Sequence, residues 1–304
     1  MTPRFPARKL PLPTSRIRAT LLVMLHRLVF LLLFLTPLAH AQTPRAPDQA
    51  PYVRYVTQPR GQEHLDTAIA HFQRGPLQVD LVAAVHVADP QYYRQLQKRL
   101  DRYPRMLFEL VAADGQQAVR TGVRTDSALS GVQLWIRDKL QLEFQLNGIE
   151  YRRANFVHAD LSPDELLTHL RAHWTDTLGM LLRWALKDAS RTTNADGSIR
   201  LGGLEILGAM APGNHALELK RMLAQELAEL GDLTAAGSDA LIGRRNEAAM
   251  AVLDRELAQG AKKLAIFYGG AHMPDMERRL QQRGFVRTST EWLVAWDLKA
   301  KPAH

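Results

Sequence analysis

Short apolar runs and alternating apolar and polar positions predict β-strands in two parts of the chain. Near the beginning, the strands predicted from this pattern are Tyr52–Gln58, Leu65–Gln73, Leu77–Val85 and Arg105–Val111. The second and third flank Arg74-Gly75-Pro76, which is typical of a hairpin turn. Near the end, Lys263–Gly269 predicts another strand, and Phe285–Leu298 predicts one or two closing strands.

Apolar residues spaced three and four apart predict helices between these strands and through the middle of the chain. The predicted helices are Asp89–Leu100, Gly131–Leu146, Ser162–Trp174, Thr177–Lys187, Asn214–Leu230, Gly243–Gln259 and Met276–Arg283. The third opens on a capping box, Ser162-Pro163-Asp164-Glu165. Together the elements predict an α/β fold: a central mixed sheet flanked by helices, with a mainly helical insertion at about 130–240.

The N-terminal segment has the pattern of a secretory signal peptide. Residues 1–27 hold six Lys or Arg and no acidic residue, an apolar run follows at Leu28–Leu38, and Ala39-His40-Ala41 fits a signal-peptidase site. We therefore expect cleavage near Ala41/Gln42, a short linker at 42–51, a folded domain at 52–304, and a periplasmic or secreted protein. Met24 is an alternative start, and an uncleaved membrane anchor is the alternative to cleavage.

The charge and the missing residue types exclude several classes of protein. The chain has 39 basic and 31 acidic residues, but removal of the six basic residues in the leader leaves 33 against 31. A nucleic-acid partner is therefore not expected, nor is a membrane partner after cleavage. The chain has no cysteine, which excludes disulfides and Cys-bound metals. The sequence also lacks a G-x-S-x-G elbow, a P-loop and a G-x-G-x-x-G motif.

Two histidines stand where predicted strands end, and both follow small residues. They occur in Ala83-Ala84-Val85-His86 and in Gly269-Gly270-Ala271-His272, and Glu109 lies in the strand after the first. If these strands are neighbours in one sheet, the side chains can meet at its edge. Two imidazoles and a carboxylate suit a divalent metal ion (Zn, Mn, Co or Fe) that activates water. The alternative is that each histidine is a hydrogen-bonded structural residue and that Glu109 faces solvent.

Three further groups of polar residues are weaker candidates. Arg245-Asn246 begins a predicted helix, where it can bind a carboxylate or an oxyanion or simply form a solvated first turn. His169 and His173 share a helix face, but Leu170 replaces the glutamate of the metalloprotease pattern. His158 and Asp160 precede the capping box and organise that loop or contact the site.

In their order and spacing, these motifs resemble the TraB/GumN/Tiki family, which is related to the erythromycin-esterase and ChaN-like group. The matching positions are Ala83–His86, Glu109, Arg245-Asn246 and Gly269–His272, and the resemblance spans about 65–298. Ala83 departs from the family pattern, which has glycine there, and would narrow the site if a positive φ is required. These relatives include divalent-metal-dependent proteases, esterases that use a histidine base, and haem-binding proteins. The resemblance therefore implies one of these activities for the chain.

The predicted function is hydrolysis of a peptide or ester bond in a peptide or small-molecule substrate outside the cytoplasm. His86, Glu109 and His272 would bind a metal or, without one, position and deprotonate water, while Arg245 and Asn246 stabilise the oxyanion. One alternative is a haem or iron carrier that uses Tyr92, Tyr93 and His86. Another alternative is a family member that has lost its activity and acts as a partner-binding scaffold without metal or cofactor. The replacement of the family's glycine by Ala83 is the observation that supports it.

Overall fold

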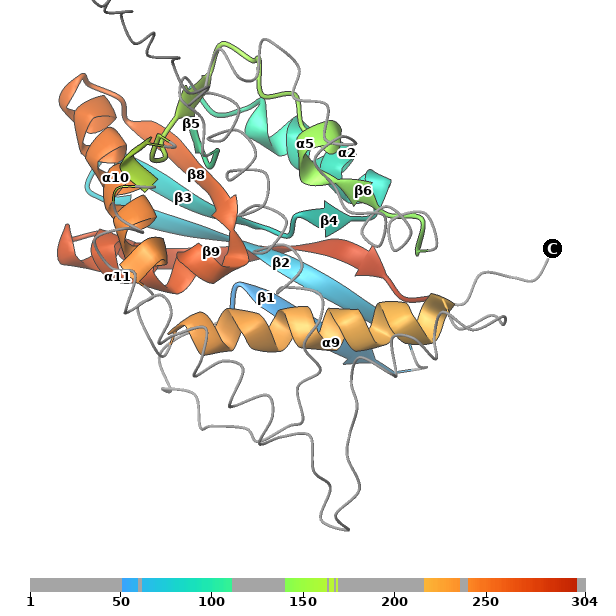
Figure 1. Cartoon of the computed structure of the whole chain (residues 1–304). Coiled ribbons are helices and arrows are strands. Elements are labelled where there is room, and N and C mark those ends of the chain that lie inside the picture. The colour runs from blue at the N-terminus through green and yellow to red at the C-terminus, as the bar shows by residue number, and fades with distance from the viewer. Residues whose placement is uncertain are drawn as a thin grey trace, which may run out of the picture.

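The central element is a seven-stranded mixed sheet, drawn in Figure 1 as a twisted layer between helices. The computed structural model describes residues 51–59, 62–110, 140–162, 164–166, 168, 216–235 and 240–299. The predicted signal peptide, most of the linker, His169, His173 and the predicted helix Thr177–Lys187 lie outside these residues.

The sheet has an antiparallel part and a parallel part. The strands of the antiparallel part are β1 (Val53–Gln58), β2 (Gln62–Arg74) and β9 (Val286–Asp297), and β2 also pairs antiparallel with β3 (Leu77–Ala84). The parallel part runs in the order β3, β8 (Lys263–Gly269), β5 (Arg105–Phe108) and β7 (Phe156–His158). The α/β fold with a mixed sheet flanked by helices, predicted from the sequence, is confirmed.

Helices cover both faces of the sheet, because its middle strands are apolar on both sides. On one face lie α2 (Pro90–Leu100) and α9 (Ala216–Ala235), and on the other lie α10 (Ala240–Ala258) and α11 (Met273–Gln282). Successive residues of β3 alternate between the two cores, with Leu81 and Ala83 on the α10 and α11 side and Val82 and Ala84 on the α2 side. Each face thus buries its own hydrophobic core.

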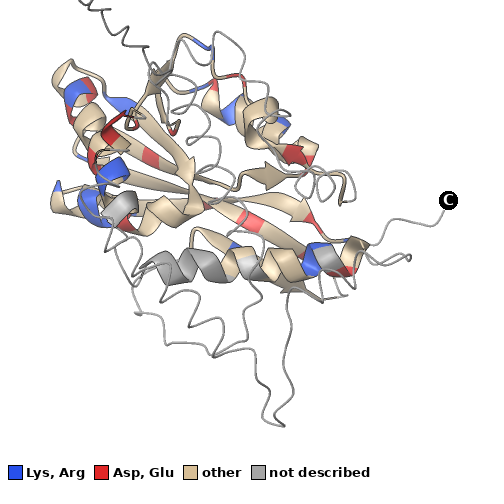
Figure 2. Ribbon diagram, in the orientation of Figure 1, with Lys and Arg blue, Asp and Glu red and all other residues tan. Residues whose placement is uncertain are grey.

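Charged residues of both signs stand close together on α10 and α11 (Figure 2). They join the two helices at the surface, where Arg283 Nη2 lies 2.8 Å from Asp254 Oδ2. No described helix reaches the combination of length and apolar character that crossing a membrane requires.

Some segments that the sequence predicts as helical form short strands instead. Residues 143–146, predicted as helix, instead form the short strand β6 (Glu143–Phe144), paired with β4 (Val87–Ala88), and enter the single turn α5 (Gln145–Gly148). β7 belongs to the main sheet, although it lies within the predicted helical insertion. The segment predicted as one or two strands at Phe285–Leu298 forms one, β9 (Val286–Asp297). Tertiary pairing decided these segments, because their local apolar spacing fits helix and strand alike.

The capping box is present: Ser162 Oγ accepts a hydrogen bond from the Glu165 amide at 3.3 Å, and Glu165 Oε2 accepts one from the Ser162 amide at 2.8 Å. The concern about Ala83 is removed, because the positive φ angles of the described residues belong to Gln141, Gly75, Gly260 and Gly284. Alanine therefore fits the extended backbone of β3 without strain.

Gly270 is required for space, not for its conformational freedom. A Cβ atom added there would stand 2.5 Å from Val53 Cγ2, inside the contact between β1 and the turn that carries His272. We expect Gly270→Ala to lower the free energy of unfolding by about 1–3 kcal/mol, measured by urea denaturation, because β1 must move. The control is Gly243→Ala in α10, where the nearest atom is 3.9 Å away. This change should be neutral or stabilise by up to about 1 kcal/mol; equal effects of the two variants would contradict the steric explanation.

Candidate active site

The carboxyl ends of the four parallel strands meet at one edge of the sheet, and each is followed by a polar residue. Glu109 follows β5 directly, His86 follows β3 by two residues, Asp160 follows β7 by two, and His272 follows β8 by three. Parallel pairing places Ala84 beside Gly269 and Phe108 beside Phe267. Residues from distant parts of the sequence are therefore brought to the same rim.

Glu109 is held by one hydrogen bond on each carboxylate oxygen. Its Oε2 accepts from the Gly269 amide at 2.7 Å, and its Oε1 accepts from Arg245 Nη2 at 2.6 Å. The prediction that Glu109 lies within the strand is wrong by one residue, because β5 ends at Phe108. A Cβ atom on Gly269 would stand 3.4 Å from Glu109 Oε2 and 3.6 Å from His86 Nε2, so the missing side chain leaves room for both groups.

Arg245 joins two buried carboxylates. Its Nε donates to Asp160 Oδ1 at 3.0 Å and its Nη2 to Asp160 Oδ2 at 2.6 Å, in addition to the bond to Glu109. The Asp160 side chain is 0 % exposed. Burial lowers the pKa of Arg245, but the two carboxylates more than offset this and raise it, so the guanidinium stays charged.

The two carboxyls respond differently to this environment. Burial raises the pKa of Glu109, but the adjacent Arg245 charge and the Gly269 amide outweigh it and hold that pKa well below its usual range. For Asp160, burial prevails over the same arginine, and the pKa is raised. Glu109 therefore stays ionised to lower pH than Asp160 does.

Asn246 fixes the tautomer of His272. The Asn246 Nδ2 donates to Asp275 Oδ2 at 2.8 Å and to the His272 carbonyl at 3.3 Å, so Asn246 Oδ1 faces His272 Nδ1 at 2.7 Å. A carbonyl oxygen only accepts hydrogen bonds, so Nδ1 must carry the proton. In the neutral ring, Nε2 then presents its lone pair to the site.

His272 is neutral over the ordinary pH range. Burial lowers its pKa to about 4; Glu109 opposes this shift, while Arg245 adds to it. Its Nε2 lies 3.6 Å from Glu109 Oε1 and 3.5 Å from Arg245 Nη1. The ring also packs edge-on against Tyr268, with centroids 5.1 Å apart. A neutral, oriented imidazole between a carboxylate and a guanidinium has the chemistry of a general base.

The structure brings together His86, Glu109, Arg245, Asn246 and His272, the full set predicted from the sequence. The placement of Arg245 and Asn246 at the start of a helix is wrong, because α10 begins at Ala240 and both lie in its second turn. Their side chains, not the free amides of a helix N-terminus, reach the site.

Of the pair His158 and Asp160, only the second contacts the site. His158 Nε2 is hydrogen-bonded to the Leu110 carbonyl, and its ring packs against Phe108. Asp275 was missed in the sequence, although it follows His272 by three residues in the same motif. A carboxylate at that spacing, at the start of a helix, was the available signal.

The donor set does not suit a resident divalent metal as it stands. Both oxygens of Glu109 already accept hydrogen bonds, and the Arg245 guanidinium occupies the position beside Glu109 Oε1 and His272 Nε2 where a cation would have to bind. In the part of the chain that the structure describes, no three His, Asp or Glu side chains form a group that could hold a metal ion. The metal ion stays a prediction, and no catalytic step is derived from it.

The tyrosines suggested as haem ligands are already engaged in the core. Tyr92 hydrogen-bonds Thr67 Oγ1 at 3.0 Å, and Tyr93 donates to the Val85 carbonyl at 2.8 Å. Burial raises the pKa of both hydroxyls, which disfavours the tyrosinate that an iron ligand requires. The geometry therefore does not favour haem binding through these residues.

Comparison of the chain with models of known protein families, with curated proteins and with solved structures finds no match. The fold and the site together define an α/β protein with a polar site at the carboxyl edge of a mixed sheet. The resemblance to the TraB/GumN/Tiki family stays a prediction.

We expect His272 to make stability depend on acid pH. Its pKa is lowered from 6.5 to about 4 in the folded protein, so the unfolded chain binds the proton first. The contribution of His272 to the free energy of unfolding is fully present above pH 6.5 and is lost as the pH falls toward 4, by up to about 3 kcal/mol. Urea denaturation across this interval should show a smaller loss for His272→Gln than for the wild type; identical losses would contradict the assignment.

We expect Arg245→Gln to lower the free energy of unfolding by about 3–5 kcal/mol, because two buried carboxyls lose their counter-charge. The matched control is the neighbouring Arg244→Gln, whose ion pair with Glu247 is exposed. This control should change stability by less than about 1 kcal/mol. The ion-pair network would be unimportant if both variants unfolded at the same urea concentration.

Proposed function

We propose that this chain is a hydrolase of ester or peptide bonds that acts outside the cytoplasm, with His272 as a metal-independent general base. The observation that carries the proposal is the hydrogen bond between Asn246 Oδ1 and His272 Nδ1 at 2.7 Å, which leaves Nε2 unprotonated and directed into the site. The resemblance to the esterase relatives and the signal-peptide pattern of the N-terminus support it from the sequence.

Each neighbour has a distinct part in this proposal. A water bound at His272 Nε2 gives its proton to that nitrogen and attacks the carbonyl carbon of the substrate. The tetrahedral intermediate then collapses, the bond to the alcohol or amine breaks, and the imidazolium returns the proton to that leaving group. In the free protein the Arg245 Nη1 group faces the lone pair of Nε2 at 3.5 Å, so the entering water must displace it from that nitrogen. The displaced guanidinium then stabilises negative charge on the oxygen of the attacked carbonyl. Glu109 stabilises the protonated imidazole once it forms, and the partly exposed His86 meets the substrate from the solvent side.

Asn246 acts as a positioning residue for the base. It holds the productive tautomer but does not touch the substrate, and Asp275 holds Asn246 in turn. An acceptor on the second ring nitrogen is a common way to orient a histidine base. Loss of the Asn246 amide should therefore impair the catalytic step more than substrate binding.

The test is a screen of the mature chain against fluorogenic ester and peptide libraries, followed by variants on whatever substrate responds. We expect His272→Ala to lower kcat by about 100-fold or more, since a positioned base contributes that much. His158→Ala is the control, because that histidine lies nearby but is bonded to the Leu110 carbonyl; it should keep near wild-type kcat. Wild-type kcat in His272→Ala would eliminate the proposed base.

The pH profile separates a positioned base from a merely structural histidine. A base must be unprotonated, so kcat should fall as the pH drops through the pKa of His272, about 4. Asn246→Asp places a carboxylate beside His272 Nδ1, which favours the imidazolium and should move this acid limb upward by about one pH unit or more. An acid limb that does not move in Asn246→Asp would contradict the positioning role.

Chelation tests the metal alternative directly. We expect activity to survive prolonged EDTA treatment, and elemental analysis of the purified chain to give no stoichiometric metal on His86, Glu109 and His272. Loss of activity with EDTA, restored by Zn²⁺ or Mn²⁺, would replace the metal-independent mechanism with the metal-dependent one.

A further inference from the structure

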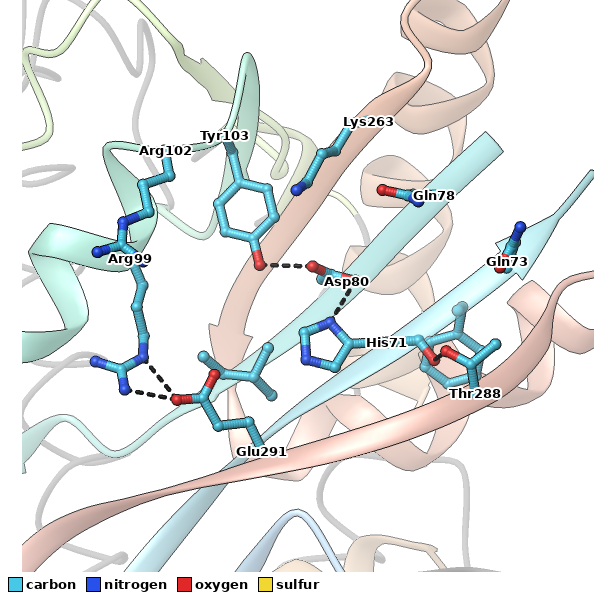
Figure 3. A pocket seen from close by; sticks show the side chains of 12 residues that line it. His71, Gln73, Gln78, Asp80, Arg99, Arg102, Tyr103, Lys263, Thr288 and Glu291 are labelled. Atoms are coloured by element: carbon cyan, nitrogen blue, oxygen red, sulfur yellow. Dashed lines mark hydrogen bonds and ion pairs between the residues drawn. The ribbon is translucent and has the colours of Figure 1, made fainter. Parts of the chain in front are cut away.

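A polar cavity lies at the opposite end of the parallel strands from the candidate active site. Its volume is about 330 Å³. The residues that line it come from β2, β3, β8, β9 and the end of α2: Ile69, His71, Phe72, Gln73, Gln78, Asp80, Arg99, Arg102, Tyr103, Lys263, Thr288 and Glu291. Figure 3 shows them around one hollow. The pair Gln78 and Lys263 stands six residues before the pair Ala84 and Gly269, about 20 Å along the strands.

The acidic groups of this cavity are already neutralised. Asp80 accepts a hydrogen bond from the Tyr103 hydroxyl at 2.6 Å and pairs with His71 Nδ1 at 2.9 Å, as the dashed lines in Figure 3 mark. The hydrogen bond that His71 donates to Asp80 raises the pKa of His71, which favours the charged pair. Glu291 pairs with Arg99, whose Nε lies 3.0 Å from Glu291 Oε1.

Two cations of the lining are not neutralised in this way. Arg102 and Lys263 have exposed side chains, and neither forms an ion pair with another residue of the described part of the chain. The Lys263 ammonium stands 5.6 Å from the centre of the Tyr103 ring. The cavity therefore has an excess of positive charge next to the aromatic ring of Tyr103.

We propose that this cavity binds a small organic anion, with its carboxylate or phosphate at the cationic rim that Arg102 and Lys263 provide and an apolar or aromatic body against Tyr103. A guanidinium and an ammonium both recognise these anionic groups. The volume is at the lower end of the range for small-molecule sites, which fits a compact ligand. The buried Asp80–Tyr103 hydrogen bond holds the aromatic ring in place before the ligand arrives.

This site is independent of the hydrolytic one. Gln78 and Lys263 lie at the beginnings of β3 and β8, whose other ends lead to His86 and His272, and the cavity shares no residue with that network. Its ligand therefore need not be a substrate or product of the proposed reaction, and the two proposals can fail separately.

Calorimetric titration at low ionic strength with four probes tests the proposal: phenyl phosphate, benzoate, inorganic phosphate and the uncharged benzyl alcohol. We expect saturable binding of phenyl phosphate or benzoate, with the better of the two identifying the anionic group, weaker binding of inorganic phosphate, and none of benzyl alcohol. Failure of both aromatic anions to bind at millimolar concentration would overturn the proposal.

The double variant Arg102→Gln/Lys263→Gln should weaken binding of the better probe by about tenfold or more, because two charge-assisted contacts are lost. The matched control is Arg94→Gln/Lys98→Gln, which removes the same charge from exposed positions of α2 outside the cavity. It should bind within about twofold of the wild type. Equal weakening by the two double variants would show a general charge effect and would also overturn the proposal.

Discussion

Parallel pairing of β3, β8, β5 and β7 is the constraint on which the rest of the structure depends. In a parallel sheet all strands point the same way, so all carboxyl ends meet along one edge. Glu109, Asp160 and His272 are consequently neighbours, although 163 positions separate the first from the last. Antiparallel pairing of β5 or β8 would place these groups at opposite ends of the sheet, and no site would exist.

At that edge, the site is organised around the buried positive charge of Arg245, which requires negative partners. Arg245 stays ionised because Glu109 and Asp160 compensate for the water it has lost. The same guanidinium then determines the state of its neighbours, since it keeps Glu109 ionised and disfavours protonation of His272. A single arginine thus stabilises this rim and reinforces the neutral state of His272 that burial already favours.

The two ends of the parallel strands are built on contrasting principles. At the carboxyl end, Glu109, Asp160, Arg245, Asn246 and His272 are joined by hydrogen bonds and ion pairs in a largely buried network. At the amino end, the acidic residues are matched, but Arg102 and Lys263 remain open to solvent around a cavity. A closed network suits preorganised proton transfer, whereas unmatched cations beside a cavity suit capture of an anion from solution.

The sequence by itself determined the α/β class and most strands and helices, and it identified His86, Glu109, Arg245, Asn246 and His272 as candidates, because these depend on local patterns. The apolar runs before His86 and His272 predict buried strands, and the small residues beside them predict close packing. The same local reading misplaced β6 and β7, since a stretch of two or three residues carries no periodicity from which strand and helix can be told apart.

Only the tertiary structure decided how these residues relate to one another. The bidentate contact of Arg245 with Asp160, the tautomer that Asn246 imposes on His272, and the engagement of both Glu109 oxygens depend on distances between segments far apart in the chain. No sequence pattern encodes whether a carboxylate already has a partner. For that reason the sequence predicted a metal-ligand set, whereas the folded chain places a guanidinium where the cation would bind.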